Sequence, residues 1–135
     1  MDEARATGVV GLGLDLVEVE RMRRIIERQG ARFLQRVFTR GERDYCSAKS
    51  SPAVFYAARF AAKEAVSKAF GTGIGAAIGW LDIEVVRNPA GVPEVHLTGK
   101  GAELAGSRGV DKILLSLTHT ETVAAASVVL QAGGR

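Results

Sequence analysis

Apolar and polar residues alternate near both ends of the chain, and between these stretches the apolar residues recur at helical spacing. Residues 9–19 alternate in the manner of a strand, and residues 112–130 predict two further strands joined at about Thr120–Glu121. Two short alternating runs within 81–99 flank the turn sequence NPAG, which predicts a hairpin. The pattern therefore predicts strands at the start, in the second half and at the end of the chain.

Helical spacing fills the intervening segments. Residues 19–30, which end at Gly30, predict an amphipathic helix, and residues 53–70 predict a long alanine-rich helix. Ser51 and Pro52 suit the cap and the first turn of the long helix. Its alanines offer a thin apolar surface that lets the helix lie close against a sheet. Shorter helices are expected in three other segments: 32–38, 39–49 and 98–109.

The last predicted strand is apolar on both of its faces. One face carries Val123, Ala125 and Val129, and the other carries Ala124, Ala126, Val128 and Leu130. A strand buried on both faces in so short a chain needs two covering layers. Helices supply one layer, and the other comes from a second subunit or from the same subunit. If a second subunit covers the strand, Ala124, Ala126 and Val128 are the residues expected at the contact.

Composition narrows the class of protein. The 135 residues suit a single domain over 1–135, with 1–7 and 132–135 expected to be flexible. The only cysteine, Cys46, leaves no internal disulfide, which fits a reducing cytosol and a cytoplasmic location. The polar first residues do not form a signal peptide, and no apolar run approaches the roughly 20 residues of a membrane span. A net charge of +3 favours an anionic partner: nucleic acid, nucleotide, phosphate ester or acidic protein.

The first candidate functional group is Asp15, in the otherwise apolar sequence GLGLDLVEVER. Gly11 and Gly13 lack the third glycine of a dinucleotide-binding fingerprint, because residue 16 is leucine. Two interpretations of Asp15 remain: a helix cap where the strand passes into the helix, or a functional carboxylate. An unpaired carboxylate among leucines is costly, so its partner matters in either case.

The second candidate is the helical sequence AARFAAKEAVSKAFGTG. Glu64 and Lys68 are spaced i,i+4, which on a solvated surface gives an ion pair worth about a few tenths of a kcal/mol. Arg59, Lys63 and Ser67 share a neighbouring face. These charges either are solvated or hold an anion. The glycines that follow either end the helix or let the backbone approach a phosphorylated ligand.

His119 ends a predicted strand beside two threonines, where a lone histidine is commonly a hydrogen-bonded structural residue. With His96 as its only companion and a single cysteine, the chain has no zinc-ligand pattern. Ser116 lacks the flanking glycines of a nucleophile elbow. A thiol dyad of Cys46 and His119 stays open, although nothing around Cys46 favours it.

Arginines are concentrated between residues 21 and 43. Arg21, Arg24 and Arg28 fall on one face of the predicted helix. That face is either solvated or a docking surface for an acidic protein or for nucleic-acid phosphates.

Three ordered motifs, GLGLDLVEVERM, RFAAKEAVSKAFGTGI and SLTHTETVAAASVV, resemble those of bacterial holo-[acyl-carrier-protein] synthases, which are small 4'-phosphopantetheinyl transferases. The resemblance covers roughly residues 8–130. It implies transfer of 4'-phosphopantetheine from coenzyme A to a serine of apo acyl carrier protein, with release of adenosine 3',5'-bisphosphate. It also implies Mg²⁺, lipid biosynthesis, a homotrimer with active sites between subunits, and an α+β fold with an antiparallel sheet packed on a long central helix. Whether the carrier serves fatty-acid synthesis or a polyketide pathway stays open.

The resemblance also assigns roles to residues. Asp15 and Glu64 are the implied metal ligands, and Lys68, which neutralises phosphate oxygens, joins them as the implied catalytic group. The implied coenzyme-binding residues are Arg59, Phe60, Ser67, Lys68, Gly71, Gly73, Pro93 and His119. The implied docking residues for the acidic carrier are Arg21, Arg24 and Arg28. The base that accepts the serine proton stays open between Glu64 and a metal-polarised water.

Two other classes of protein compete with this interpretation. A small basic nucleic-acid-binding protein is expected to interleave aromatic residues with its basic ones, yet only Phe33 and Phe38 lie in the arginine-rich segment. A non-catalytic oligomeric scaffold gives no reason for acids at Asp15 and Glu64. The sequence therefore favours an enzyme with neither nucleic acid nor membrane among its partners.

Overall fold

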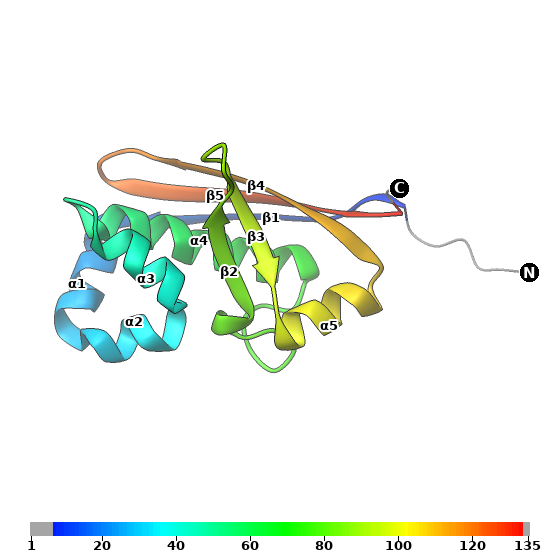
Figure 1. The fold of residues 1–135 in the computed structure, drawn as a ribbon, viewed down its shortest axis with the longest axis horizontal. Helices are drawn as coiled ribbons and strands as arrows, with labels where there is room; N and C mark the ends of the chain where they lie inside the picture. The colour runs from blue at the N-terminus through cyan, green and yellow to red at the C-terminus, as the bar shows by residue number, and fades with distance from the viewer. Residues whose placement is uncertain (1–6, 134–135) are drawn as a thin grey trace, which may run out of the picture.

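Strands and helices follow one another in mixed order in the computed structural model, which describes residues 7–133 (Figure 1). The strands are β1 (Gly8–Glu18), β2 (Ile83–Arg87), β3 (Pro93–Leu97), β4 (Val110–His119) and β5 (Val123–Ala132). The helices are α1 (Val19–Gln29), α2 (Ala31–Val37), α3 (Arg40–Ser47), α4 (Pro52–Phe70) and α5 (Gly99–Ser107), with a 3₁₀ turn, η1 (Trp80–Asp82), before β2. These bounds confirm the predicted strands, hairpin and helices to within a few residues. Within residues 7–133, none of the helices has the length and apolar character needed to cross a membrane.

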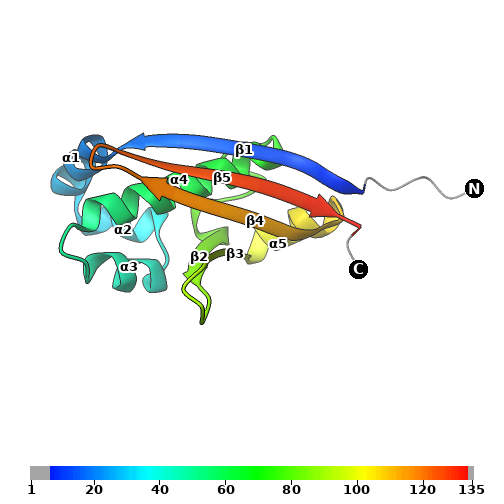
Figure 2. The ribbon, with the colours of Figure 1, turned by 90° about the horizontal axis from the view of Figure 1, so that it is seen from above.

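β1, β5 and β4 form an antiparallel sheet with β5 in the centre (Figure 2). Asp15 of β1 and Leu117 of β4 pair with the same residue of β5, Ala126, from its two sides. Helix α4 packs along one face of this sheet. The predicted α+β architecture, an antiparallel sheet on a long central helix, is therefore confirmed.

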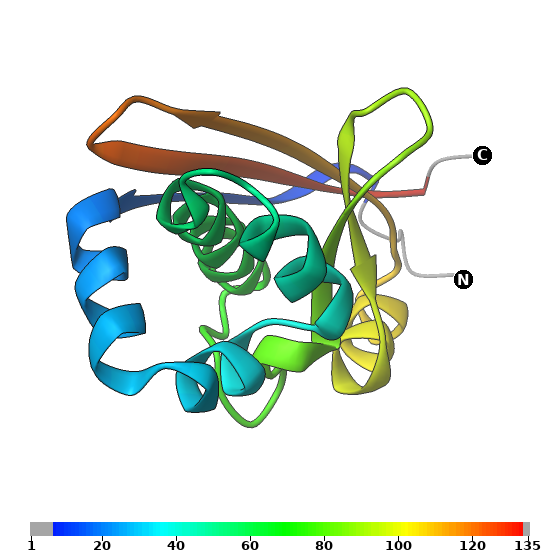
Figure 3. The same ribbon diagram turned by 60° about the vertical axis from the view of Figure 1, so that its left-hand side comes forward.

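The remaining elements enclose α4. Figure 3 views α4 nearly end on, with the sheet above it, α1 on its left, α2 below it, and α3 followed by the β2–β3 hairpin and α5 on its right. The hairpin turns at Asn88, whose side-chain oxygen accepts hydrogen bonds from the amides of Ala90 and Val92. This local bonding explains why the sequence NPAG predicts the turn.

Three predictions need correction. Ala124, Ala126 and Val128 are buried, and they cover α4 in their own subunit rather than a neighbour, because their side of β5 is the side on which the helix packs. Ser51 precedes α4 but makes no side-chain cap hydrogen bond, although Pro52 does begin the helix. Ala132, which was expected to be flexible, ends β5 in register with β1 and β4. The rest of the two ends expected to be flexible, apart from residues 7 and 133, lies outside the described residues.

The outer face of the sheet, opposite α4, is apolar and exposed. Leu12, Leu14 and Leu16 of β1 are 70%, 62% and 66% exposed, and Leu114 of β4 is 40% exposed. Between them β5 presents only half-buried or exposed side chains on this side, Val123, Ala125, Ser127 and Val129. Contiguous apolar surface of this kind marks an interaction site. Both faces of β5 are apolar: α4 covers one of them, and none of the described residues covers the other.

Candidate active site

Small residues bring β1 and α4 into close contact beside the site. A Cβ added to Gly13 would lie 1.8 Å from the carbonyl oxygen of Ala65, and one added to Gly11 would lie 2.4 Å from that of Ala69. Only glycine allows the strand to approach the helix so closely. Because alternate residues of a strand share a face, Asp15 points toward α4 as Gly13 does.

Asp15, Glu64 and Lys68 line one pocket of about 480 Å³ between β1, α1 and α4, here called the active-site pocket. Lys68 Nζ lies 2.7 Å from Asp15 Oδ1. Glu64 stands one helical turn before Lys68 on the same helix. Phe60 of α4 also lines the pocket, together with the α1 residues Arg21, Met22 and Ile25. The structure thus brings together the three residues to which the resemblance assigns catalysis.

Two simpler interpretations of these residues are wrong. Asp15 is not a helix cap, since it lies within β1 and the cap position of α1 is Glu18. Lys68 does not form the surface ion pair with Glu64 that i,i+4 spacing predicted, because its ammonium contacts Asp15 instead. Both charges therefore point into the pocket that the strand and the helix share.

The pocket holds unbalanced negative charge. Burial raises the pKa of Glu64, and the neighbouring charge of Asp15 raises it further, while Lys68 acts in the opposite direction. The pKa of Lys68 is raised because its ammonium donates a hydrogen bond to the Asp15 carboxylate. The pocket lining carries three carboxylates, Asp15, Glu18 and Glu64, and two cations, Arg21 and Lys68, so additional positive charge would stabilise the ionised carboxylates.

The residues to which the resemblance assigns coenzyme binding do not all reach this pocket in one chain. Phe60 lines it, whereas Ser67 is fully buried and donates its hydroxyl to the Glu64 carbonyl oxygen at 2.7 Å. Gly71 caps the end of α4 in a left-handed conformation, with Gly73 two residues further on. Three others lie outside the pocket lining: Arg59, Pro93 and His119.

Arg59 belongs to a second group of charges around the ring of Tyr45, here called the tyrosine cluster. The guanidinium carbon of Arg59 lies 4.3 Å from the ring centroid, Lys49 Nζ lies 4.5 Å away, and the guanidinium carbon of Arg87 lies 5.3 Å away. Arg59 is 2% exposed, and its Nε has no hydrogen-bond partner. Among the described residues these three cations form no ion pair with a carboxylate. The cluster is therefore suited to an anion.

His119 and Pro93 lie near the tyrosine cluster. The His119 ring is 6.0 Å from that of Phe55, which in turn is 6.1 Å from that of Tyr45. Pro93 pairs with Arg87 across the β2–β3 hairpin. Since β1 and β4 are the two edges of the main sheet, Asp15 and His119 belong to opposite edges.

Sequence reasoning missed three members of the tyrosine cluster, Tyr45, Lys49 and Arg87. Tyr45 of α3 and Lys49 of the loop after it are only four residues apart, but Arg87 comes from β2, so local spacing does not link the whole cluster. Of the cation–ring contacts, that of Arg87 requires the hairpin to pack against α3, and that of Arg59 requires α4 to pack against α3. The general excess of basic residues was the only feature of the sequence that indicated an anion-binding site.

Cys46 is not a nucleophile in this fold. Its side chain is fully buried, and desolvation raises the pKa of the thiol to about 12. A neutral, inaccessible thiol neither attacks a substrate nor pairs with the exposed His119. The thiol-dyad interpretation is therefore excluded.

Arg21, Arg24 and Arg28 are exposed along α1 and form a positively charged surface, here called the docking face after the role that the resemblance implies. Arg21 lines the active-site pocket, while Arg24 and Arg28 border a shallow depression further along the helix. Arg24 also lies 3.6 Å from Glu20, an exposed contact of little energetic weight. This face begins at the rim of the pocket and is open to a partner.

Known proteins share both the sequence and the fold. The family description "4'-phosphopantetheinyl transferase superfamily" matches residues 11–127. The chain is 44% identical over 123 residues to a holo-[acyl-carrier-protein] synthase of Geotalea daltonii, an alignment that covers 91% of this chain and 98% of the relative.

Solved structures agree with this. The holo-[acyl-carrier-protein] synthase of Neisseria meningitidis matches with a TM-score of 0.85 and 31% identity, covering 91% of this chain and 98% of that one. A Bacillus anthracis holo-(acyl-carrier-protein) synthase in complex with CoA (3',5'-ADP) matches with a TM-score of 0.77 and 34% identity, covering 93% of this chain and 99% of that one. The chain therefore belongs to the holo-[acyl-carrier-protein] synthase family, within the 4'-phosphopantetheinyl transferase superfamily.

Proposed function

We propose that this protein transfers 4'-phosphopantetheine from coenzyme A to a serine of apo acyl carrier protein. The serine oxygen bonds to the phosphorus that carries pantetheine, the serine proton passes to Glu64 or to a water molecule, the diphosphate bridge breaks, and adenosine 3',5'-bisphosphate leaves. The observation that carries the proposal is the convergence of Asp15, Glu64 and Lys68 in one pocket of a chain that belongs to this family. The attacking hydroxyl belongs to the carrier, which agrees with the absence of an activated nucleophile in the pocket lining.

Asp15 and Glu64 fit a Mg²⁺ site. Burial, and next to it the charge of Asp15, raises the pKa of Glu64, so a divalent cation at this site would relieve a repulsion that Lys68 compensates only in part. Within the described residues no group of three or more histidine, cysteine, aspartate or glutamate side chains is placed to hold a metal. Two carboxylates suit Mg²⁺, which commonly completes its octahedron with substrate phosphates and waters. Bound Mg²⁺ supplies positive charge to the diphosphate as negative charge develops during displacement.

Lys68 and the tyrosine cluster divide the negative charge of coenzyme A between them in this proposal. Lys68 is half exposed and reaches the pocket, so its ammonium can contact diphosphate oxygens there. The tyrosine cluster offers three cations without carboxylate partners to a further phosphate of the coenzyme. The unpartnered Nε of the buried Arg59 supports this use, because such a group is costly unless something binds it.

A homotrimer with shared active sites is part of the proposal. The active-site pocket adjoins the β1 edge of the sheet and the tyrosine cluster adjoins the β4 side, so each of them can take part in a site shared with a different neighbouring subunit. Cyclic assembly can place the pocket of one subunit beside the cluster of the next. The exposed leucines of the outer face, Leu12, Leu14 and Leu16, supply apolar surface for such a contact.

The docking face of α1 is assigned to the carrier. Acyl carrier proteins are acidic, and Arg21, Arg24 and Arg28 present positive charge from the pocket rim outward. Carrier bound there would bring its serine to the pocket that holds the diphosphate. The same proposal places the protein in the cytoplasm, because a chain with a single cysteine fits a reducing compartment.

Intact-mass analysis tests the reaction. Apo carrier incubated with the protein, coenzyme A and Mg²⁺ is expected to gain the mass of one phosphopantetheine, and a carrier whose acceptor serine is replaced by alanine is expected to gain none. Omission of Mg²⁺ with chelator present should stop the gain. An unmodified wild-type carrier in the complete mixture would overturn the proposed function.

Complementation tests the shared site. Asp15→Asn damages the pocket and His119→Ala damages the tyrosine-cluster side, so each variant alone should be inactive or nearly so. Mixed oligomers formed by co-expression should regain activity, because some interfaces then combine two intact halves. The matched control pairs Asp15→Asn with Glu64→Gln, which damage the same half and should not complement. Equal activity in both mixtures would contradict a site built from two chains.

A further inference from the structure

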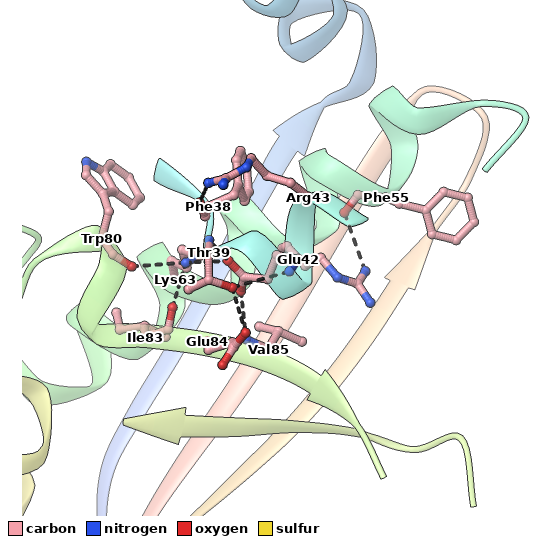
Figure 4. A network of polar contacts seen from close by, with 11 residues as sticks. Phe38, Thr39, Glu42, Arg43, Phe55, Lys63, Trp80, Ile83, Glu84 and Val85 are labelled. Atoms are coloured by element: carbon pink, nitrogen blue, oxygen red, sulfur yellow. Dashed lines mark hydrogen bonds and ion pairs between the residues drawn. The ribbon is translucent and has the colours of Figure 1, made fainter. Parts of the chain in front are cut away.

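A fully buried ion pair joins α4 to α3 beside the active-site pocket. Lys63 Nζ lies 2.8 Å from Glu42 Oε1, and both side chains are 0% exposed (Figure 4). Burial lowers the pKa of Lys63, and the charge of Glu42 acts against this shift. Removing two charges from water is costly, and an apolar pair of similar volume often stabilises a fold as well. The presence of the pair therefore calls for a reason other than stability.

Main-chain groups of η1 and β2 are bound by this pair. Lys63 donates to the carbonyl oxygens of Trp80 at 3.0 Å and Ile83 at 2.6 Å, so its three ammonium hydrogens all have partners. Glu42 Oε2 accepts a hydrogen bond from the amide of Val85 at 2.7 Å. Figure 4 shows these groups pointing toward one another from three parts of the fold. The pair therefore determines where this segment lies relative to α4.

Trp80 connects the pair with the pocket. Its ring stacks on that of Phe60, with centroids 4.8 Å apart and planes inclined by 29°. Phe60 lines the active-site pocket with Glu64 and lies one helical turn before Lys63. The two stacked rings are here called the aromatic wall. Lys63 holds the backbone of Trp80, and the ring of the same residue supports Phe60.

We propose that Lys63, held by Glu42, is a positioning residue that fixes the aromatic wall and thereby the fit of coenzyme A in the pocket. This inference rests on the proposed function. An apolar pair could fill the same space, but it could not hold the Trp80 carbonyl, and the stacked ring would lose its fixed support. Lys63 positions the aromatic wall through its hydrogen bonds to the main chain rather than through its charge pairing with Glu42.

The double variant Lys63→Met/Glu42→Leu tests this. It removes both charges and keeps the volume nearly constant, so it should cost less stability than removal of one charge alone, although the bound main-chain groups lose their partners. Trp80 is the only tryptophan of the chain, so the tryptophan bands of the near-ultraviolet circular dichroism spectrum come from the aromatic wall. We expect weaker tryptophan bands and a KM for coenzyme A raised about five- to tenfold. The kcat should change by less than about twofold, because ground-state and transition-state binding are lost together.

Cys46→Ala is the matched control. Cys46 is fully buried on α3, as Glu42 is, but makes no hydrogen bond to the segment of Trp80. It is expected to lower stability while the tryptophan bands and the KM stay at wild-type values. If the folded double variant also keeps both wild-type values, the pair is purely structural and the proposal is overturned.

Trp80→Leu keeps the proposal testable if the double variant does not fold. This substitution removes the ring but leaves the main-chain carbonyl that Lys63 binds. It is expected to raise the KM for coenzyme A by a similar factor, and an unchanged KM would overturn the role of the aromatic wall. The wild-type mass assay is read first, since an inactive wild type would refute the proposed function rather than this inference.

Discussion

Helix α4 contributes one lysine to each of two lysine–carboxylate pairs. The closed pair, Lys63 with Glu42, is buried inside the protein, and the open pair, Lys68 with Asp15, lies at the solvent-accessible pocket. Lys63 lies 2.8 Å from Glu42 with both side chains fully buried, whereas Lys68 lies 2.7 Å from Asp15 with side chains 52% and 16% exposed. The two nitrogen–oxygen distances are nearly equal, so distance does not distinguish the two pairs. The pairs differ in how far their side chains are exposed to solvent and in their other partners.

The other partners of the two lysines explain the difference. Lys63 binds two main-chain carbonyls in addition to Glu42, whereas Lys68 adds only a long contact of 3.5 Å to the carbonyl oxygen of Leu14. An exposed pair is worth about 0–1 kcal/mol and can be exchanged for another partner at little cost. Loss of one member of a buried pair costs about 3–5 kcal/mol. The open pair is thus suited to meet a substrate, and the closed pair is suited to hold structure.

The largest effect is expected at the carboxylate beside the open pair. Glu64→Gln keeps the shape of the side chain and removes its charge, so transfer should fall by about three orders of magnitude. That factor corresponds to about 4 kcal/mol in the activation barrier. Holo-carrier formation followed by intact mass measures it. Glu103→Gln, at an exposed position of α5, is the control, and a similar loss there would show that the effect is not specific to the pocket.

Single substitutions of the two lysines should separate the pairs in stability. Lys63→Met leaves Glu42 buried without its cation, so the free energy of unfolding should drop by about 3–5 kcal/mol. Lys68→Met should change it by less than about 1 kcal/mol, because water replaces the lost partner. Urea unfolding of both variants under the same conditions gives the comparison. Equal losses would mean that burial does not determine the difference between the pairs.

The sequence predicted that the residues around the open pair lie together, but it did not predict the partners of the closed pair. Asp15, Glu64 and Lys68 lie in ordered motifs, and the glycines of GLGLD allow the strand to meet the alanine-rich helix. Lys63 looked like a solvated or anion-binding charge because its partners come from distant segments. Glu42 precedes it by about twenty residues, and the Trp80 and Ile83 carbonyls follow at 17 and 20 residues. No local pattern reports such pairing.

The face of β5 was mispredicted for a related reason. Alternation shows which residues share a face, but it does not say which face meets the helix when both are apolar. Pairing of β5 with both neighbours places Ala124 and Ala126 on the side of α4, as the small residues Gly11 and Gly13 of β1 also are. The packing of α4 against β1 and β5, which is a long-range property, settles the assignment.

Arg21 of the docking face lies at the rim of the pocket that holds the open pair, so its charge should act on the acidic carrier. Arg21→Glu at the pocket rim should lower kcat/KM for the carrier about tenfold, equivalent to about 1.4 kcal/mol, and reduce its salt dependence. The KM for coenzyme A should change little. Arg40→Glu alters net charge equally at an exposed position of α3 and serves as control. A comparable loss in the control would assign the effect to net charge.

A smaller effect concerns the pH dependence of stability. Burial and the charge of Asp15 raise the pKa of Glu64 in the folded state. A carboxyl with a raised pKa gives its full stability only below its unfolded pKa, and that stability is lost as pH rises through the folded pKa. Without metal, Glu64→Gln should therefore be more stable than wild type at about pH 8 and similar to it at about pH 3. Urea titrations at both pH values test this, and a less stable variant at the higher pH would refute the direction.

The smallest expected effect concerns competition at Asp15. The Lys68 ammonium lies 2.7 Å from Asp15 Oδ1, so a divalent cation that binds this oxygen must displace or share the lysine. Lys68→Met should therefore tighten binding of Mg²⁺ to the coenzyme-free protein by about two- to threefold, the size expected for an exposed pair. The same substitution should weaken binding of coenzyme A, because the diphosphate loses a cation. Opposite signs for the two ligands distinguish exchange of partners from general damage to the pocket.

Isothermal titration calorimetry with Mg²⁺ alone and with coenzyme A alone measures both effects. Lys100→Met, at an exposed position of α5, removes the same net charge away from the pocket and should leave both affinities near wild type. Equal tightening of Mg²⁺ in this control would assign the change to net charge. Weaker Mg²⁺ binding by Lys68→Met would show that the lysine supports the metal rather than competing with it, and the open pair would then be a fixed part of the site, as the closed pair is of the core.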